Sequence, residues 1–300
     1  MHYIGEISAI CAALAWSMCA LIFTVASRRI GAFSMNHYKT TFAVFIIAAM
    51  QLVTKGTLLP FHISSLNWFL LALSGIIGFV LADSSLYQSY MDLGPRKGIL
   101  IFNFYPLVST VLAWFFLGEA LSIYALLGIA VTSAGIVWVV SEKVAVKEGT
   151  HTKHFRRGVL FAIAAGLFQA IGFTLVKPIM TGIDPVDPLT TTLIRGAFGC
   201  ATYWAVTILR GRLTVVLKKA SDKKSMKFIL MGSLIGSSFG VLLAMVAVKM
   251  APVGIASTLM ALMPIMVLPM VAIVHKEQLS MRAIFGTIIA CVGVAILFNV

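Results

Sequence analysis

The chain alternates long apolar runs with short polar stretches. A helix needs about 20 mostly apolar residues to cross the hydrocarbon core of a bilayer. Only proline and glycine interrupt the runs, whereas a membrane barrel would show short segments that alternate at every second residue. The pattern therefore predicts an all-α membrane protein with ten transmembrane helices. The predicted spans are residues 4–26, 36–53, 68–90, 98–118, 121–140, 158–178, 189–209, 228–248, 254–274 and 282–299.

The two halves of the chain resemble each other. A shift of 158 residues aligns Pro106 with Pro264, Glu119 with Glu277, Leu121-Ser122 with Leu279-Ser280, Gly128 with Gly286, and Gly135 with Gly293. We expect one five-helix copy over residues 1–140, a basic linker over 141–157, and a second copy over 158–300. Because five is odd, the second copy must cross the membrane in the opposite sense. Inverted repeats of this kind are typical of secondary transporters.

Composition supports lipid as the main solvent of the chain. Hydrophobic residues make up 60% of the sequence and charged residues 11%, with a mean hydropathy of +1.01. Soluble domains carry about 25% charged residues, so ordinary soluble enzymes, disordered proteins and secreted disulfide scaffolds are excluded. The four cysteines lie in apolar stretches without metal-ligand spacing, and we interpret them as small core residues.

The net charge of +13 indicates how the chain is oriented in the membrane and does not indicate a nucleic-acid partner. With ten spans, 18 of the 23 lysine and arginine residues fall in loops on one side. The positive-inside rule makes that side cytoplasmic and places both termini outside. We therefore expect a multi-pass protein of the plasma (inner) membrane, with the lipid bilayer as a partner and no nucleic acid.

Asp83 is the strongest candidate for function among the polar groups inside the spans. A charge near the bilayer centre costs at least about 2.5–3.5 kcal/mol on insertion scales, and such residues are commonly functional. Tyr87 lies one helical turn beyond Asp83, and Gln88 lies on the neighbouring face. Asp83 could bind a proton or a substrate amine in a cavity. The alternative is a structural ion pair or hydrogen bond to a neighbouring helix.

Three basic residues also fall within predicted spans. With a small slip in register, Lys39 and Arg195 are equivalent in the two copies, and both are candidates for contacting an anion. Lys177 precedes Pro178 near the end of its span, on a helix that also carries Gln169. The alternative for these cations is that the side chain reaches the interface.

Two further groups of polar residues could line a cavity. Trp16 and Ser17 lie in the middle of the first span, although a packing role for Trp16 is the alternative. Asn103 and Tyr105 flank Pro106, and the equivalent prolines predict paired kinks whose freed carbonyls can face a cavity. Structural roles are expected for two other sets. Glu119 and Glu277 would cap helices or accept from loop amides, and the paired glycines would form packing faces.

An integral-membrane enzyme is the main alternative class, and a sensor or receptor is a third. The closest acidic pair, Asp184 and Asp187, lies in the short segment GIDPVDP, which turn chemistry explains. The six histidines lie in or beside predicted loops, and no GxSxG, HExxH or P-loop pattern occurs. We therefore expect no catalytic residue, no metal and no cofactor.

The motifs resemble the drug/metabolite transporter superfamily, specifically EamA-type members with two five-helix repeats. The resemblance rests on Trp16-Ser17, Lys39 and Arg195, the glycine pairs, and the segments NFYPLVSTVLAWFFLGEALS (103–122) and MPIMVLPMVAIVHKEQLS (263–280). Two departures occur, because Gln169 replaces a frequent tryptophan and His275-Lys276 precede Glu277 where the family usually has glycine.

That resemblance implies a secondary transporter with a central cavity formed by spans 1–4 and 6–9. The expected function is export of small polar metabolites, such as amino acids, by alternating access, with Asp83 as the coupling or substrate-amine group and a proton as the candidate coupling ion. The alternative is an exchanger of anionic metabolites such as sugar phosphates or nucleotide-sugars. Members usually have cytoplasmic termini, in contrast to the charge count here. The sequence leaves open a monomer or a dimer.

Overall fold

The structure, a computed structural model, describes residues 3–58, 63–93, 95–141, 154–275 and 280–299. All regular elements in these ranges are helices. They are α1 Ile4–Ile30, α2 Ala32–Lys55, α3 Ser65–Gly75, η1 Ile76–Ala82, α4 Asp83–Leu93, α5 Pro95–Phe102, α6 Tyr105–Leu117, α7 Ile123–Val140, α8 Phe155–Thr181, α9 Pro188–Leu209, α10 Leu213–Lys219, α11 Lys223–Gly232, η3 Ser233–Gly240, α12 Val241–Met250, α13 Val253–Met260, α14 Met263–His275 and α15 Met281–Phe298.

Each predicted span lies on helix, but not every one has the length and hydropathy of a membrane crossing. Seven helices within the described ranges reach both, and Ile4–Cys19 and Val253–Val267 are shorter apolar stretches. The remaining predicted span, 36–53, lies on α2, whose first half carries the polar run Asn36–Thr41. The fold is therefore that of a multi-pass all-α membrane protein, while the count of ten crossings stays a prediction.

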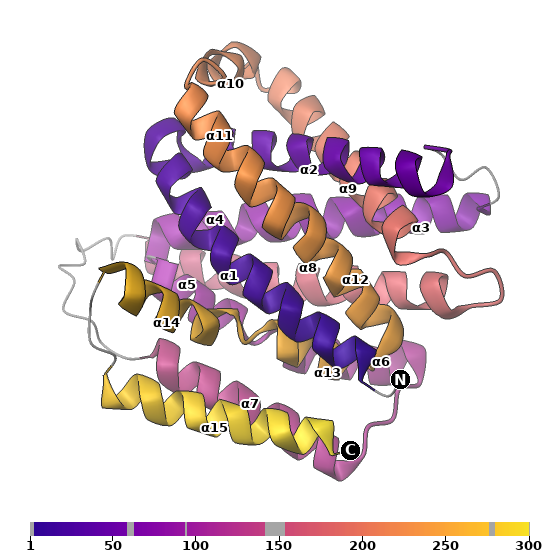
Figure 1. The fold of residues 1–300 in the computed structure, drawn as a ribbon, viewed down its shortest axis with the longest axis vertical. Helices are drawn as coiled ribbons and strands as arrows, with labels where there is room; N and C mark the ends of the chain where they lie inside the picture. Colours follow the sequence, from indigo (N-terminus) through magenta and orange to yellow (C-terminus); the bar gives the residue numbers. More distant parts are fainter. Residues whose placement is uncertain (1–2, 59–62, 94, 142–153, 276–279, 300) are drawn as a thin grey trace.

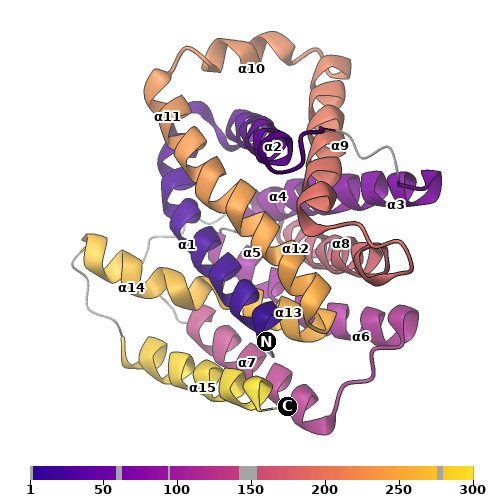
Figure 2. The same cartoon turned by 45° about the vertical axis from the view of Figure 1, so that its right-hand side comes forward.

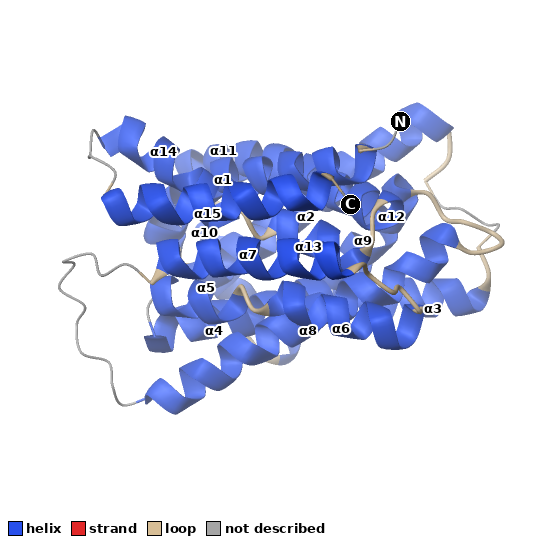
Figure 3. Ribbon diagram, turned by 90° about the horizontal axis from the view of Figure 1, so that it is seen from below, coloured by secondary structure: helices blue, strands red, loops and turns tan. Residues whose placement is uncertain are grey.

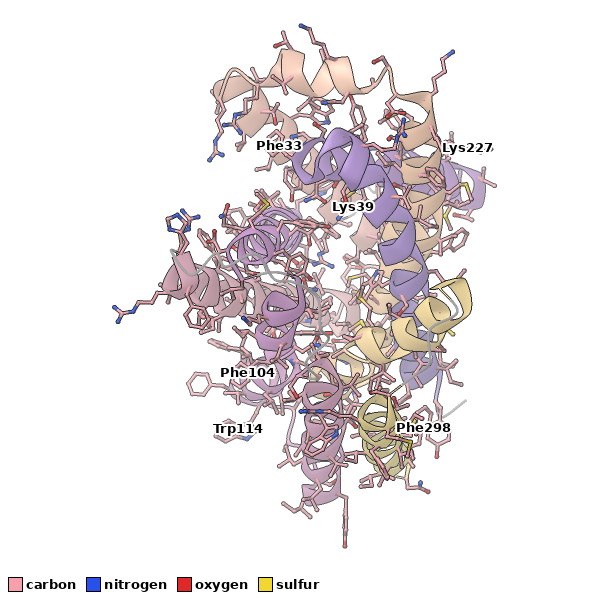
Figure 4. The ribbon with its side chains drawn as sticks, turned by 90° about the vertical axis from the view of Figure 1, so that its left-hand side faces the viewer. Phe33, Lys39, Phe104, Trp114, Lys227 and Phe298 are labelled. Carbon is pink, nitrogen blue, oxygen red and sulfur yellow. The ribbon has the colours of Figure 1, made fainter. Side chains whose placement is uncertain are left out.

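The helices form one bundle in which several helices cross one another, and the two termini lie close to each other (Figure 1, Figure 3). Large apolar side chains cover the outside, including Phe45, Phe115 and Phe116 at about 70% exposure. Figure 4 looks along the bundle and shows Phe104 and Trp114 at its outer edge. An apolar surface of this extent is suited to lipid.

The two halves of the chain, residues 3–141 and 154–299, interleave. Helix α1 packs along α11, η3 and α12, while α2 packs on α9, α4 on α8, and α6 on α8 and α13. Figure 1 and Figure 2 show α1 beside α11 and α12 in both views. The core is therefore built between the halves rather than separately within each.

Helices α7 and α15 lie together at one edge of the bundle (Figure 1). A Cβ on Gly135 would lie 2.5 Å from the backbone N of Ala290 and 2.7 Å from Gly286 O, and a Cβ on Gly128 would lie 2.8 Å from the Leu297 side chain. These contacts confirm the predicted glycine packing faces, because only glycine lets the two backbones approach this closely.

The repeat also appears in the helix breaks. Helix α5 ends at Phe102 and α6 begins at Tyr105, and the 158-residue shift maps these positions onto Met260 and Met263, which end α13 and begin α14. The predicted paired kinks near Pro106 and Pro264 are therefore confirmed. The same shift maps η1 onto residues 234–240, within η3. Short π-helical segments are frequent at functional sites.

Candidate functional site

Lys39 on α2 and Asp83 at the start of α4 form an ion pair inside the bundle. The Lys39 Nζ donates to Asp83 Oδ2 at 3.0 Å. Figure 4 places Lys39 among the helices rather than on the outer surface. The side chains of Lys39 and Asp83 are 15% and 25% exposed, so the pair is largely buried. The ion pair offsets the cost of placing each charge in the membrane interior.

Tyrosines lie close to this ion pair. Tyr87 follows Asp83 by one helical turn and packs edge-on against Tyr90, with ring centroids 5.9 Å apart. On α9, the Tyr203 hydroxyl donates to the carbonyl of Phe79 at 2.8 Å. Phe79 lies in η1, four residues before Asp83. We name Lys39, Asp83 and Tyr87 the central polar cluster.

Helices α2 and α9 share a second polar contact region that sequence reasoning missed. His37 is 1% exposed, so the expectation that all histidines lie in or beside loops was wrong for this residue. Its Nδ1 lies 2.8 Å from Phe33 O, its Nε2 contacts the Thr207 hydroxyl, and Asn36 Nδ2 donates to Tyr203 at 3.2 Å. The run of polar residues at 36–41 was the available signal for this region.

Arg195 on α9 is buried, at 2% exposure. Its Nη1 lies 2.8 Å from the Met245 sulfur, and its guanidinium carbon lies 5.2 Å from the centre of the Phe79 ring. Its Nε has no hydrogen-bond partner among the described residues. Interfacial snorkelling therefore does not describe Arg195, because a side chain that reached the interface would be exposed.

Trp16 and Ser17 connect α1 to the second half of the chain. The Trp16 Nε1 donates to Gly236 O in η3 at 3.2 Å. The Ser17 hydroxyl lies 2.7 Å from Ala13 O and 2.9 Å from Met263 O, at the break before α14. Ser17 has no exposed surface. Both residues therefore make packing contacts in this structure.

Asn103 and Tyr105 lie at the break between α5 and α6. Tyr105 is buried, and its hydroxyl donates to Ser257 O on α13 at 2.9 Å. Asn103 is also buried, and its Nδ2 has no partner among the described residues. Tyr105 therefore joins the two broken helices, while Asn103 keeps an unused donor.

Gln88 belongs to a polar group at one end of the bundle rather than to the central polar cluster. It donates to Asp92 Oδ1 at 3.1 Å. Asp92 also accepts from Arg157 at 2.6 and 2.8 Å. This bidentate ion pair links the end of α4 to the start of α8.

Lys177 lies at the opposite end of the bundle. Its Nζ donates to Ala251 O at 2.7 Å and lies 3.6 Å from Glu119 Oε1. Helix α8 runs antiparallel to η1–α4, with Gly172 beside Gly78. Since Asp83 lies five residues after Gly78, it is level with residue 167 of α8. Lys177 is ten residues further along α8, which corresponds to about 15 Å at 1.5 Å per residue. It does not join the central polar cluster, and Gln169, half-buried on α8, makes no hydrogen bond that the described residues show.

Glu119 has the structural role that its position predicts, with a different partner. Its Oε2 accepts from the backbone N of Val253 at 2.7 Å, at the start of α13. Ser122, rather than Glu119, caps the following helix by accepting from Ala125 at 3.1 Å. The equivalent Glu277 lies outside the described residues.

Asp187 is explained by helix capping, as the turn interpretation expected. Its Oδ1 accepts from the backbone N of Leu189 and of Thr190 at 3.1 Å, which caps α9. The opposing Lys55 side chain pairs with the same carboxylate. Within the described ranges, no group of three His, Cys, Asp or Glu side chains is placed to hold a metal ion.

Comparison with known proteins agrees with this architecture. The EamA-like transporter family matches residues 3–141 and again residues 156–299. One solved crystal structure superposes over 99% of both chains with a TM-score of 0.80 at 14% sequence identity, which establishes the fold alone. No curated protein matches the chain by sequence.

The matched residues cover nearly the whole chain, so the chain belongs to the EamA-like transporter family, within the drug/metabolite transporter superfamily. It is a membrane transporter with two copies of the family repeat.

Proposed function

We propose that this protein is a secondary transporter that exports small polar metabolites, such as amino acids, across the plasma membrane by alternating access. The observation that carries the proposal is the ion pair of Lys39 and Asp83, two opposite charges held in the bundle interior with side chains that are 15% and 25% exposed. Asp83 is the coupling group, since protonation of its carboxylate removes the attraction to Lys39 and so releases the ion pair that joins α2 to α4.

The ion pairs between the halves support a movement of one half against the other. At one end of the bundle the pairs are Arg29–Asp222 and Arg157–Asp92, and at the other end they are Lys55–Asp187 and Lys177–Glu119. Each of these pairs joins the first half to the second. Opening at either end separates the pairs there and leaves those at the other end intact, as alternating access requires.

The test is transport by the full-length protein in proteoliposomes under an imposed pH gradient, with a panel of labelled amino acids. We expect Asp83→Asn to abolish proton-linked transport and Asp83→Glu to retain it. Asp184→Asn, in an exposed loop, serves as the matched control. Unchanged proton-linked transport by Asp83→Asn would show that the coupling role is wrong.

The double variant Lys39→Met/Asp83→Asn separates coupling from structure. If the ion pair only holds α2 to α4, removing both charges restores proton-linked transport. If Asp83 carries the proton, the double variant stays uncoupled. Comparing uptake in vesicles of opposite orientation tests the proposed direction.

A further inference from the structure

Among the described residues, the charge on Arg195 has no carboxylate partner. Within the described ranges, each acidic group of the ion pairs already faces another base: Lys39, Lys55, Arg29, Arg157 or Lys177. The guanidinium offers five N–H donors. The contacts around it are the Met245 sulfur, a weak acceptor, and the face of the Phe79 ring. Burying a cation with only these weak partners costs free energy, so the presence of arginine at this position needs an explanation.

Comparison of the two repeats shows which partner Arg195 lacks. In the first half, Lys39 faces Asp83, and Tyr87 lies one turn further on. The 158-residue shift maps Asp83 onto Val241 and Tyr87 onto Met245. Met245 is the residue that contacts Arg195. The second half therefore keeps the basic residue of the first half and its neighbouring helix but has valine where the carboxylate stands.

The surroundings of the guanidinium are small and adaptable. A Cβ on Gly78 would lie 3.0 Å from Arg195 Nη2, and a Cβ on Gly172 would lie 3.5 Å from it. Two glycines thus flank the cation, and the Met245 side chain, unbranched and with three rotatable bonds, can move aside. Phe79, whose ring faces the guanidinium, lies one turn before Asp83, so one continuous helical segment carries both this contact of Arg195 and the acidic residue of the central polar cluster.

We infer that Arg195 binds the carboxylate of the transported metabolite, which displaces the Met245 thioether from the guanidinium. The inference rests on the proposed transport function and specifies its substrate class. The planar guanidinium matches a carboxylate with two parallel hydrogen bonds. The ion pair of Lys39 and Asp83 is neutral overall, so one unmatched positive charge remains and suits a single carboxylate. A phosphate dianion would need a second cation.

Ligand-dependent thermal stability of the full-length protein in detergent micelles tests the inference. The probes are aliphatic, aromatic and amino carboxylates, each compared with its amide, for example lactate with lactamide and alanine with alaninamide. A ligand that binds only the folded protein raises its unfolding temperature. We expect at least one carboxylate to stabilise the wild type, and its amide not to do so.

Substitutions at two positions should remove this stabilisation in opposite ways. Arg195→Met removes the cation, and Arg195→Lys, which keeps charge but not the planar fork, should weaken binding roughly tenfold or more. Val241→Asp supplies an internal carboxylate and should also abolish the shift, whereas Val241→Asn should retain it. Arg210→Met, just beyond α9, is the exposed control.

Asp83→Asn distinguishes this inference from the proposed function, because it should lose proton-linked transport and keep the stabilisation by carboxylates. Three results would each overturn the inference. They are an equal shift in Arg195→Met and wild type, stabilisation by phosphate but by no carboxylate, and no stabilisation of the wild type by any carboxylate of the panel. The unfolding temperature of each variant without ligand verifies that it is folded.

Discussion

Glu119 connects the first half of the chain to the second, and its replacement should destabilise the protein measurably. Its Oε2 accepts from Val253 N at 2.7 Å and its Oε1 lies 3.6 Å from Lys177 Nζ. The side chains of Lys177 and Glu119 are 14% and 17% exposed, so solvent screens them less than a surface pair. The carboxylate also lies at the N-terminus of α13, where a negative charge is favourable.

The magnitude follows from these two contacts. A hydrogen bond to a charged group contributes about 1.5–3 kcal/mol, and a partly exposed ion pair contributes up to about 1 kcal/mol. Glu119→Ala removes both and should lower the free energy of unfolding by about 1.5–4 kcal/mol. Glu119→Gln keeps an acceptor for Val253 and should cost roughly half as much.

Equilibrium unfolding by sodium dodecyl sulfate in mixed micelles, followed by tryptophan fluorescence, measures both losses. Glu6→Ala is the matched control, since Glu6 lies in the first turn of α1 and makes no hydrogen bond that the described residues show. A loss below about 0.5 kcal/mol for Glu119→Ala, the range of ordinary surface substitutions, would refute the assignment. Equal losses for Glu119→Ala and Glu119→Gln would contradict the role of the hydrogen bond.

Three further predictions follow from other parts of the chain. Gly135→Ala should destabilise the protein by about 1–3 kcal/mol more than Gly166→Ala in the same unfolding assay. A Cβ on Gly135 would lie 2.5 Å from backbone, whereas the nearest atom to a Cβ on Gly166 would lie 3.3 Å away. Equal losses of unfolding free energy in the two variants would contradict the close packing of α7 on α15. The hydrogen bond from Arg29 lowers the pKa of Asp222 from its ordinary 3.8 to about 2. The stabilisation by this ion pair is therefore present above about pH 4 and lost as the pH falls through 2. Asp222→Asn should make the free energy of unfolding less dependent on pH between these values. The same pH dependence in Asp222→Asn and wild type would count against the ion pair. A reporter fused after Val300 should be active only outside the cytoplasm, and cytoplasmic activity would reverse the predicted orientation.

The sequence predicted the helices, their breaks and the repeat, because hydropathy and proline spacing are properties of single segments. It also placed Asp83 and Lys39 inside the membrane and left a structural ion pair open as an interpretation. It did not show that these two residues face each other, since helical periodicity gives the face of a residue but not the neighbouring helix.

The same limit explains the residues that were misplaced. Gln88 and Lys177 are polar residues within apolar runs, but their partners Asp92 and Glu119 lie at the ends of the bundle. His37 seemed to belong to a loop because it falls at the edge of an apolar run, whereas α2 begins at Ala32 and buries it. The packing of α2 on α9 supplies the Thr207 hydroxyl and the Tyr203 carbonyl, while the other carbonyl partner, Phe33 O, lies on α2 itself.

The interleaving of the halves means that neither is a self-sufficient folding unit. Helix α1 packs mainly on α11, η3, α12, α13 and α14 of the second half. A fragment ending before residue 142 would leave those apolar faces bare, and it could cover them only by recruiting a second fragment of opposite orientation. Assembly of this transporter is therefore completed only after the last helices have been inserted, and chains truncated during synthesis should be substrates for membrane proteases rather than half-active carriers.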